Sequence, residues 1–404
     1  MRAKLWPILI LCFVVAGALP LPAQQKGQYM PGQSGLNAGV FPSPGFTYVN
    51  MEINYDTNTI NNSSGNAVNP KPNLNLWVVE NWMIYVTNAK FLGGNLGFVI
   101  IFPTVANGSL TLERVNVSGS TYGLADTWVQ PFALGWHLKR ADIQIGDAFM
   151  TPTGRYSPGA LNNIGSGYFG NHVITGTTVY LTKNKGTSAN IFTDWEVHGQ
   201  KQITNGSVYK TPGQAFTDEW GVGQVLPLSK DLSKLFQLGV IGYDQWQLTN
   251  DTMTGPQGTS VTTPAPYYSV HAVGGQANFI MPAKNLALFF KYVHEYKSYA
   301  RPLGKHDRVR RLMDASHSEA TLKVERTSNS RQNTRSLCGG LGQEEHEMKA
   351  TTVPPQPRLL VAIVLLIAFA VALGSLVHSK TVQKLKRQAT DKPAVESEAA
   401  GSGR

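Results

Sequence analysis

Long segments of alternating apolar and polar residues constrain the fold of this chain most strongly. Such alternation is typical of β-strands with two different faces. Most of the segments hold about 10–14 residues, whereas strands of soluble proteins hold about 5–6 and a membrane-crossing strand needs about 9–11. The sequence therefore predicts an all-β fold, a transmembrane antiparallel up-and-down β-barrel. We recognise eleven strands, near residues 46–55, 74–87, 95–106, 127–138, 140–150, 171–183, 189–202, 215–228, 235–248, 267–281 and 286–298.

The two faces of each predicted strand differ in polarity. Over 189–202, for example, Trp195 and Val197 alternate with Asp194, Glu196 and His198. A globular sheet would bury the apolar face, whereas a transmembrane barrel turns it toward lipid and turns the polar face toward a wet lumen. On the barrel interpretation, the alternation predicts a lumen lined by Glu52, Gln144, Asp194, Glu196, His198, Glu219 and Lys291.

Aromatic residues and connections also fit a barrel. Short turns such as 138–140 alternate with long polar loops such as 249–266, as in outer-membrane barrels. Aromatic residues near strand ends suit the two interfacial girdles, with core packing as the alternative. They are Trp77, Trp82, Tyr85, Trp128, Trp136, Tyr180, Trp220, Tyr267 and Tyr268.

The N-terminus predicts export. Arg2 and Lys4 precede an apolar run that closes with Ala23, which is the pattern of a cleaved secretory signal over residues 1–23. A short membrane anchor is the alternative. Residues 24–45 form an N-terminal segment before the predicted barrel, which we place at 46–304.

The last hundred residues differ from the rest. Residues 305–357 are polar and aperiodic, which predicts a linker or disordered segment. Residues 359–377 carry no charge and predict a transmembrane helix, with a buried core helix as the alternative, and 378–404 predict a basic, polar disordered tail. Such a helix favours retention in the inner membrane. Either the reading frame departs from the barrel's own near Gly304, through a frame shift or a fusion, or the helix is a genuine inner-membrane tether.

Composition and motifs argue against several functions. The net charge is +10, but residues 24–300 are nearly neutral, so no nucleic-acid partner is expected. The two cysteines exclude a disulfide framework. Residues 165–170 match G-x-G-x-x-G without a βα unit, and neither a metal-ligand spacing nor a G-x-S-x-G elbow occurs. We predict no enzyme and no catalytic, cofactor-binding or metal-binding residues, and we interpret Asp194, Glu196 and His198 as lumen-lining rather than hydrolytic.

Several short motifs occur in one order along the chain: GLAD at 123–126, PFALGW at 131–136, PTGRY at 152–156, LNNIG at 161–165, and FKYVHEY at 290–296 before Arg301-Pro302. In these motifs residues 36–304 resemble the outer-membrane barrel proteins of the phenol meta-pathway degradation family. Their residues have architectural roles: Pro131 suggests a bulge or strand edge, Gly135 close packing, and Asp126 a turn cap rather than a ligand contact. The motif residues are Gly123, Asp126, Pro131, Gly135, Trp136, Pro152, Gly154, Tyr156, His294 and Glu295.

The resemblance implies about twelve strands, with a last strand after the Arg301-Pro302 turn. Bacterial barrels have an even number of strands, so one strand is missing from the eleven. Ala320, Leu322 and Val324 alternate with polar residues and offer a poor candidate for the twelfth. It also implies passive transport of small hydrophobic or aromatic molecules across the outer membrane, through a polar-lined lumen, with lipid and solute as partners. The alternatives are a structural or adhesive barrel whose loops bind partners, and a membrane-anchored enzyme acting on lipids or aromatics.

Overall fold

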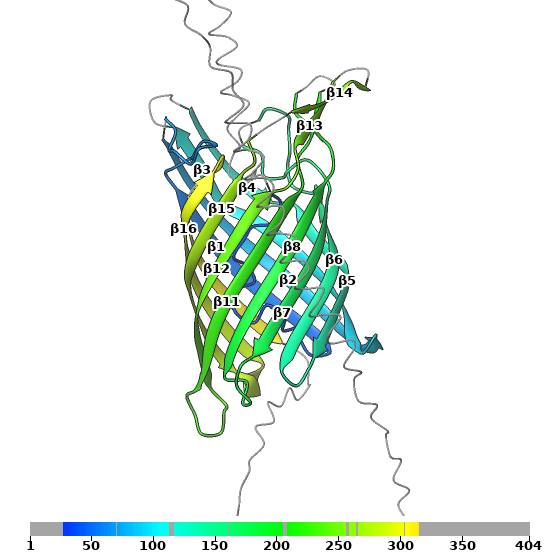
Figure 1. Cartoon of the computed structure of the whole chain (residues 1–404), viewed down its shortest axis with the longest axis vertical. Helices are drawn as coiled ribbons and strands as arrows, with labels where there is room; N and C mark the ends of the chain where they lie inside the picture. Colours follow the sequence, from blue (N-terminus) through cyan, green and yellow to red (C-terminus); the bar gives the residue numbers. More distant parts are fainter. Residues whose placement is uncertain are drawn as a thin grey trace, which may run out of the picture. The chain divides into compact units, whose positions relative to one another are not determined.

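A closed antiparallel barrel dominates the computed structural model, which describes residues 27–69, 71–112, 117–160, 162–204, 208–255, 258–263, 266–302 and 304–314. Twelve strands form the ring, and pairing of β17 with β1 closes it (Figure 1). They are β1 (Gly45–Thr57), β2 (Pro72–Phe91), β3 (Gly94–Leu112), β5 (Thr127–His137), β6 (Ala141–Thr151), β7 (Gly170–Tyr180), β8 (Thr187–His198), β11 (Ala215–Pro227), β12 (Leu235–Gln247), β15 (Ser269–Met281), β16 (Leu286–Tyr299) and β17 (Lys305–Asp314). The prediction of an all-β antiparallel fold is confirmed.

Smaller elements lie beside the ring. Strand β4 (Val117–Leu124) pairs with β3. A separate sheet has the order β14 (Ser260–Thr263), β13 (Asp251–Thr254), β10 (Tyr209–Thr211) and β9 (Lys201–Gln202). The 3₁₀ turn η2 (Pro282–Lys284) joins β15 to β16. Within the described residues, no helix has the length and apolar character that crossing a membrane requires.

The twelfth strand lies where the sequence predicted a linker. Residues 305–314 pair with β1 on one side and with β16 on the other, so the ordered chain extends past Gly304. The sequence KHDRVRRLMD is mostly charged and shows no clear alternation of apolar and polar residues. Its strand conformation is stabilised by pairing on both sides, which satisfies its peptide groups. The predicted signal 1–23, the candidate strand at 320–324, the helix 359–377 and the tail 378–404 lie outside the described residues.

Long and short connections alternate around the barrel, as predicted. Among the long ones, residues 152–169 join β6 to β7 and residues 248–268 join β12 to β15, whereas 138–140 and 181–186 are short turns. The long connections share one end of the barrel because consecutive strands are antiparallel. We call the two ends the long-loop end and the short-turn end.

The N-terminal segment, residues 27–44, lies inside the barrel (Figure 1). Gln28 contacts Ser166 and Tyr168 at the long-loop end, and Ala38 contacts Gln144 nearer the short-turn end. The segment therefore runs along the lumen before the chain enters the wall at β1. Most of its residues are buried, although many are polar or glycine.

Candidate functional site

The carboxylate of Glu219, on β11, holds the middle of the N-terminal segment. Its Oε1 accepts hydrogen bonds from the Tyr29 hydroxyl (2.7 Å) and from the backbone N–H groups of residues 32 and 33 (2.6 and 3.0 Å). Its Oε2 accepts two more, from the N–H groups of residues 34 and 35 (2.9 and 3.2 Å). Gly35 has a φ of +60°. A side chain there would overlap Gln276 and Lys291, so the turn around Glu219 requires glycine.

Further polar side chains of the wall hold the segment on either side of this turn. The Lys291 ammonium donates to the carbonyl oxygen of residue 33 (2.6 Å). The amides of Asn37 and Gln237 donate to each other (2.7 and 3.0 Å). Gln144 donates to the carbonyl oxygen of Ala38 (2.5 Å). The bonds from Lys291 and Gln144 satisfy backbone carbonyl groups in a segment that has no strand pairing, and the Asn37–Gln237 pair joins the segment to the wall through side chains.

Two histidine–carboxylate pairs lie at the start of the segment. Glu196 Oε2 accepts hydrogen bonds from the backbone N–H of Gln28 (2.6 Å) and from His198 Nε2 (3.0 Å). His172 Nδ1 lies 3.0 Å from Asp194 Oδ2. Both carboxylates and His172 are fully buried.

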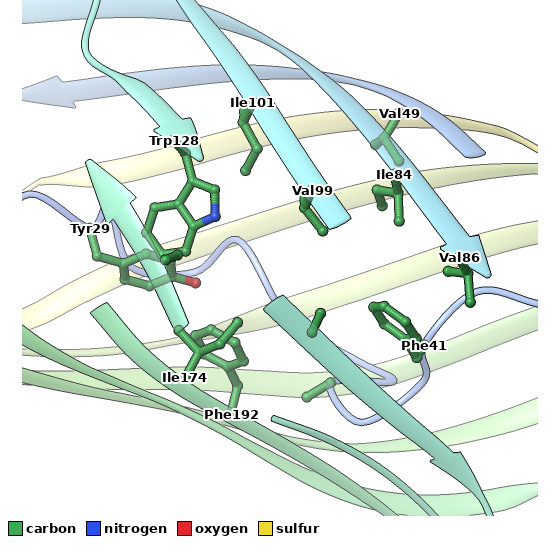
Figure 2. Packing of buried hydrophobic residues seen from close by; sticks show 13 residues of the cluster. Tyr29, Phe41, Val49, Ile84, Val86, Val99, Ile101, Trp128, Ile174 and Phe192 are labelled. Carbon is green, nitrogen blue, oxygen red and sulfur yellow. The ribbon is translucent and has the colours of Figure 1, made fainter. Parts of the chain in front are cut away.

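The opposite side of the lumen is apolar. Tyr29 and Phe41 of the N-terminal segment pack against inward side chains of β2, β3 and β5, and Figure 2 shows Trp128 beside Tyr29. The ring of Tyr29 stacks on Phe192 at 5.6 Å and lies 6.5 Å from Trp128. The cluster consists of Tyr29, Ala38, Phe41, Val49, Ile84, Val86, Val99, Ile101, Trp128, Ala133, Ala148, Ile174 and Phe192.

A cavity of about 380 Å³ lies between the segment and this apolar wall. Its lining includes Tyr29, Phe41, Leu76, Ile84, Val99, Ile101, Trp128, Ile174 and Phe192. Ten of the lining residues are polar, among them Glu80, which accepts from Gln33 (3.1 Å) and from the Trp82 indole (2.9 Å). An apolar cavity with a few fixed polar groups is typical of a binding site for a small apolar ligand.

Six of the seven predicted lumen residues face the interior, but they hold the N-terminal segment or neighbouring side chains rather than lining an open passage. They are Gln144, Asp194, Glu196, His198, Glu219 and Lys291. The prediction for Glu52 is wrong: Glu52 is exposed on the outer face of β1, while Met51 and Ile53 are buried inside. The rule that apolar residues face lipid inverts at β1 because the neighbouring part of the lumen is itself apolar.

The same inversion affects the predicted aromatic girdles. Trp128 and Tyr268 face the interior and are almost fully buried, at 6% and 1% exposure. Trp77, Tyr85 and Trp220 are exposed on the outer face, so a place in an interfacial girdle stays a prediction for them. Alternation alone does not distinguish the apolar part of the lumen from the outer face, because an aromatic side chain meets an apolar environment in both.

Three of the family motifs meet around Asp126 at the long-loop end. Its Oδ1 accepts from the Gly154 N–H (3.0 Å), and its Oδ2 accepts from the N–H and hydroxyl of Ser166 (2.7 and 2.5 Å). Burial raises the pKa of Asp126, and the hydrogen bonds from Ser166 and Gly154 offset part of the rise. Nearby, Tyr156 donates to the carbonyl oxygen of Gln202 (2.5 Å). Asp126 therefore caps the 152–169 loop.

We expect Asp126→Ala to loosen this loop. Three donors would lose a buried carboxylate, which costs about 2–4 kcal/mol of folding free energy. Thermal unfolding and limited proteolysis of the 152–169 loop measure the effect. Asp231→Ala, in a fully exposed turn at the other end, is the matched control and should leave both unchanged. Equal midpoints for the two variants would contradict the capping role.

The remaining motifs are also architectural. Pro131 lies at register shifts toward both β3 and β6, as its missing N–H predicts. A Cβ on Gly135 would lie 2.4 Å from that of Phe41, so this glycine makes room for the N-terminal segment. Trp136 instead donates to the Leu92 carbonyl oxygen (3.0 Å). Gly123 has a φ of +127°, and Pro152 is exposed at the start of the 152–169 loop.

The late motif places its two polar residues on opposite faces of β16. His294 is exposed outside, while Glu295 is buried inside and accepts from the Tyr243 hydroxyl (2.8 Å) and the Gly304 N–H (2.5 Å). Arg301 lies 3.5 Å from Glu295 and donates to Gln245 (2.7 Å). Glu295 of the late motif and Arg301 of the following turn thus form a buried ion pair close to the start of β17.

Sequence reasoning missed the N-terminal segment as part of the interior. Tyr29, Gln33 and Phe41 lie in a stretch without alternation, which gives no strand or helix signal. The one available signal was compositional, since glycine, serine, asparagine and glutamine are dense at 32–39 and suit a tightly folded, hydrogen-bonded loop.

The comparisons with known proteins agree with this architecture. The family model described as "Putative MetA-pathway of phenol degradation" matches residues 57–310. The chain belongs to this family. The match spans the barrel from the end of β1 to within β17, which is the strand that closes the ring.

Several solved structures resemble the fold of this chain. An outer membrane channel from Pseudomonas putida F1 aligns with a TM-score of 0.58 at 14% identity, over 70% of this chain and 99% of that one. The beta domain of the Bordetella autotransporter BrkA (TM-score 0.40, 9% identity, 67% and 100% covered) and the TodX monoaromatic hydrocarbon channel (0.32, 8%, 67% and 90%) are more distant. At these identities the likeness concerns the fold. No curated protein sequence matches the chain.

Proposed function

We propose that the chain is an outer-membrane channel that lets small hydrophobic or aromatic molecules pass. The observation that carries the proposal is the apolar cavity inside the ring, with Trp128, Tyr29 and Phe192 in its lining. A monocyclic aromatic molecule buries its faces against such rings with little loss of hydrogen bonding. Family membership supports the same class of solute.

The outer surface supports a membrane location. Large apolar side chains are exposed along the strands, including Trp77, Phe98, Ile145, Val173, Trp195, Val222, Leu238, Val240, Val273, Phe290 and Tyr292. In water, exposure of so much apolar surface would be unfavourable, whereas lipid acyl chains cover this surface in a membrane. A closed ring also pairs the backbone of every strand, which the hydrocarbon region demands. We infer that the ring spans the outer membrane.

Passage follows the boundary between the N-terminal segment and the apolar wall. This differs from the polar-lined passage expected from alternation, because the polar residues of the lumen, such as Glu219 and Lys291, are engaged with the segment. Burial of apolar surface holds the solute in the cavity, and the concentration gradient drives passage. Glu80 and Gln33 supply the polar groups that a phenolic hydroxyl needs.

Uptake by cells tests this function. We expect Gram-negative cells that produce the chain to accumulate a radiolabelled monocyclic aromatic solute several-fold faster than cells without it. The membrane fraction must contain the folded barrel, shown by heat-modifiable migration. Equal uptake despite a folded barrel in the outer membrane would refute the channel.

A structural or adhesive barrel is the second candidate, favoured by the occupied lumen. Glu219 alone receives five hydrogen bonds from the N-terminal segment, which resembles a plug more than a passage. Reconstituted protein separates the two candidates: saturable binding and release of the aromatic solute supports the channel, while a folded barrel that binds none supports the scaffold.

A further inference from the structure

A group of metal-ligating side chains lies in the wall outside the apolar cavity. His172 on β7 and Asp194 and Glu196 on β8 each offer one ligand atom, and these atoms all lie within 4.8 Å of one another. His172 stands directly opposite Glu196 in the strand register, and Asp194 is two residues earlier on the same inner face. All three side chains have an exposure of 0%.

Charge and hydrogen bonding are incomplete in this group. Within the described residues, neither carboxylate forms an ion pair with a lysine or arginine; their partners are the imidazoles of His172 and His198. Among the described residues, His172 Nε2 and Glu196 Oε1 are buried and have no hydrogen-bond partner. Two adjacent buried carboxylates need positive charge close by, because burial and mutual repulsion both disfavour a pair of bare negative charges.

We propose that His172, Asp194 and Glu196 bind a divalent transition-metal cation, with Zn²⁺ as the best-fitting ion. Ligand atoms about 2.0–2.2 Å from a common Zn²⁺ lie roughly 3–4.5 Å apart, within the observed limit. One imidazole nitrogen and two carboxylate oxygens suit Zn²⁺ better than Ca²⁺, which takes oxygen ligands only. The cation neutralises both carboxylates.

The site links the wall to the N-terminal segment. Glu196 Oε2 accepts from the Gln28 N–H, so an ion on Glu196 bridges β7 and β8 directly beneath the start of that segment. His198 contacts the same carboxylate and orients it as an outer partner. Sequence analysis predicted no metal site because the ligands come from two strands and form no consecutive ligand motif.

Metal binding by the purified full-length protein tests the proposal independently of transport. We expect folded, chelator-treated protein without a histidine tag to take up one tightly held Zn²⁺ per chain, measured by elemental analysis after dialysis. Co²⁺ in its place should give a visible absorption spectrum that Zn²⁺ abolishes. Asp194→Asn and Glu196→Gln should each weaken Zn²⁺ binding by more than roughly tenfold.

His271→Ala is the matched control. His271 on β15 pairs with Asp244 on β12 (2.5 Å), away from the cluster. Loss of the His271 imidazole should leave Zn²⁺ binding unchanged. The same affinity in the two carboxylate variants as in the parent would place the ion elsewhere and overturn the proposal. If those variants do not fold, the parent decides: a folded barrel that takes up no Zn²⁺ and gives no Co²⁺ spectrum means that protons alone neutralise the cluster.

Discussion

Replacement of Glu219 by alanine is expected to release the N-terminal segment from the lumen and to raise the conductance of the reconstituted barrel several-fold. Glu219 accepts from the Tyr29 hydroxyl and from four consecutive backbone N–H groups at residues 32–35. Hydrogen bonds to a charged group contribute about 1.5–3 kcal/mol each, so losing even two of the five removes at least about 3 kcal/mol from the docked state. No other described side chain accepts as many bonds from the segment.

Planar-bilayer recording measures the release, and protease treatment of the reconstituted protein gives an independent measure through cleavage within residues 27–44. Glu219→Gln keeps one acceptor oxygen and should give an intermediate conductance. Glu52→Ala, on the outer face of β1, is the control and should behave as the parent. A Glu219→Ala barrel with the parent's conductance and an uncleaved segment would show that the apolar contacts of Tyr29 and Phe41 suffice to hold it.

The barrel itself follows from the sequence because strand length and alternation are local properties. Segments such as 189–202 carry their two faces in the order of their own residues, and each short turn makes the two strands that it joins neighbours. Strand β17 was not predicted because charged residues dominate its sequence. Its strand conformation depends on pairing with β1 and β16, which are far from one another in the chain. Closure of the ring is a long-range property.

The inside of the barrel follows less well from the sequence. Alternation assigns each strand two faces, but the assignment of apolar to outside assumes a uniformly wet lumen. At β1 that assumption fails, because Val49, Met51 and Ile53 meet inward side chains of neighbouring strands, and Glu52 is left outside. On β8 and β11 the assumption holds, because Glu196 and Glu219 meet the polar backbone of the N-terminal segment. The segment's own position decides both cases, and it carries no periodic signal.

Filling the apolar cavity is expected to reduce aromatic uptake by roughly tenfold while the barrel remains folded. Ile101 lies on β3 directly opposite Trp128 and lines the cavity. An indole in place of Ile101 occupies space that the solute needs, and overpacking costs about 1–3 kcal/mol of folding free energy, which a twelve-stranded ring tolerates. Trp128 and Phe192 stay in place, so a loss of uptake reports the lost volume rather than a lost aromatic partner.

Val240→Trp is the matched substitution on the outer face, where Val240 is 54% exposed. It adds the same side chain to the barrel without entering the lumen, and cells producing it should take up the solute at the parent's rate. Fluorescence of the purified protein adds a binding measurement, because a solute beside Trp128 changes its emission. If Ile101→Trp and Val240→Trp support equal uptake, the solute passes elsewhere, and the boundary between the N-terminal segment and the wall of β2, β3 and β5 is not its route.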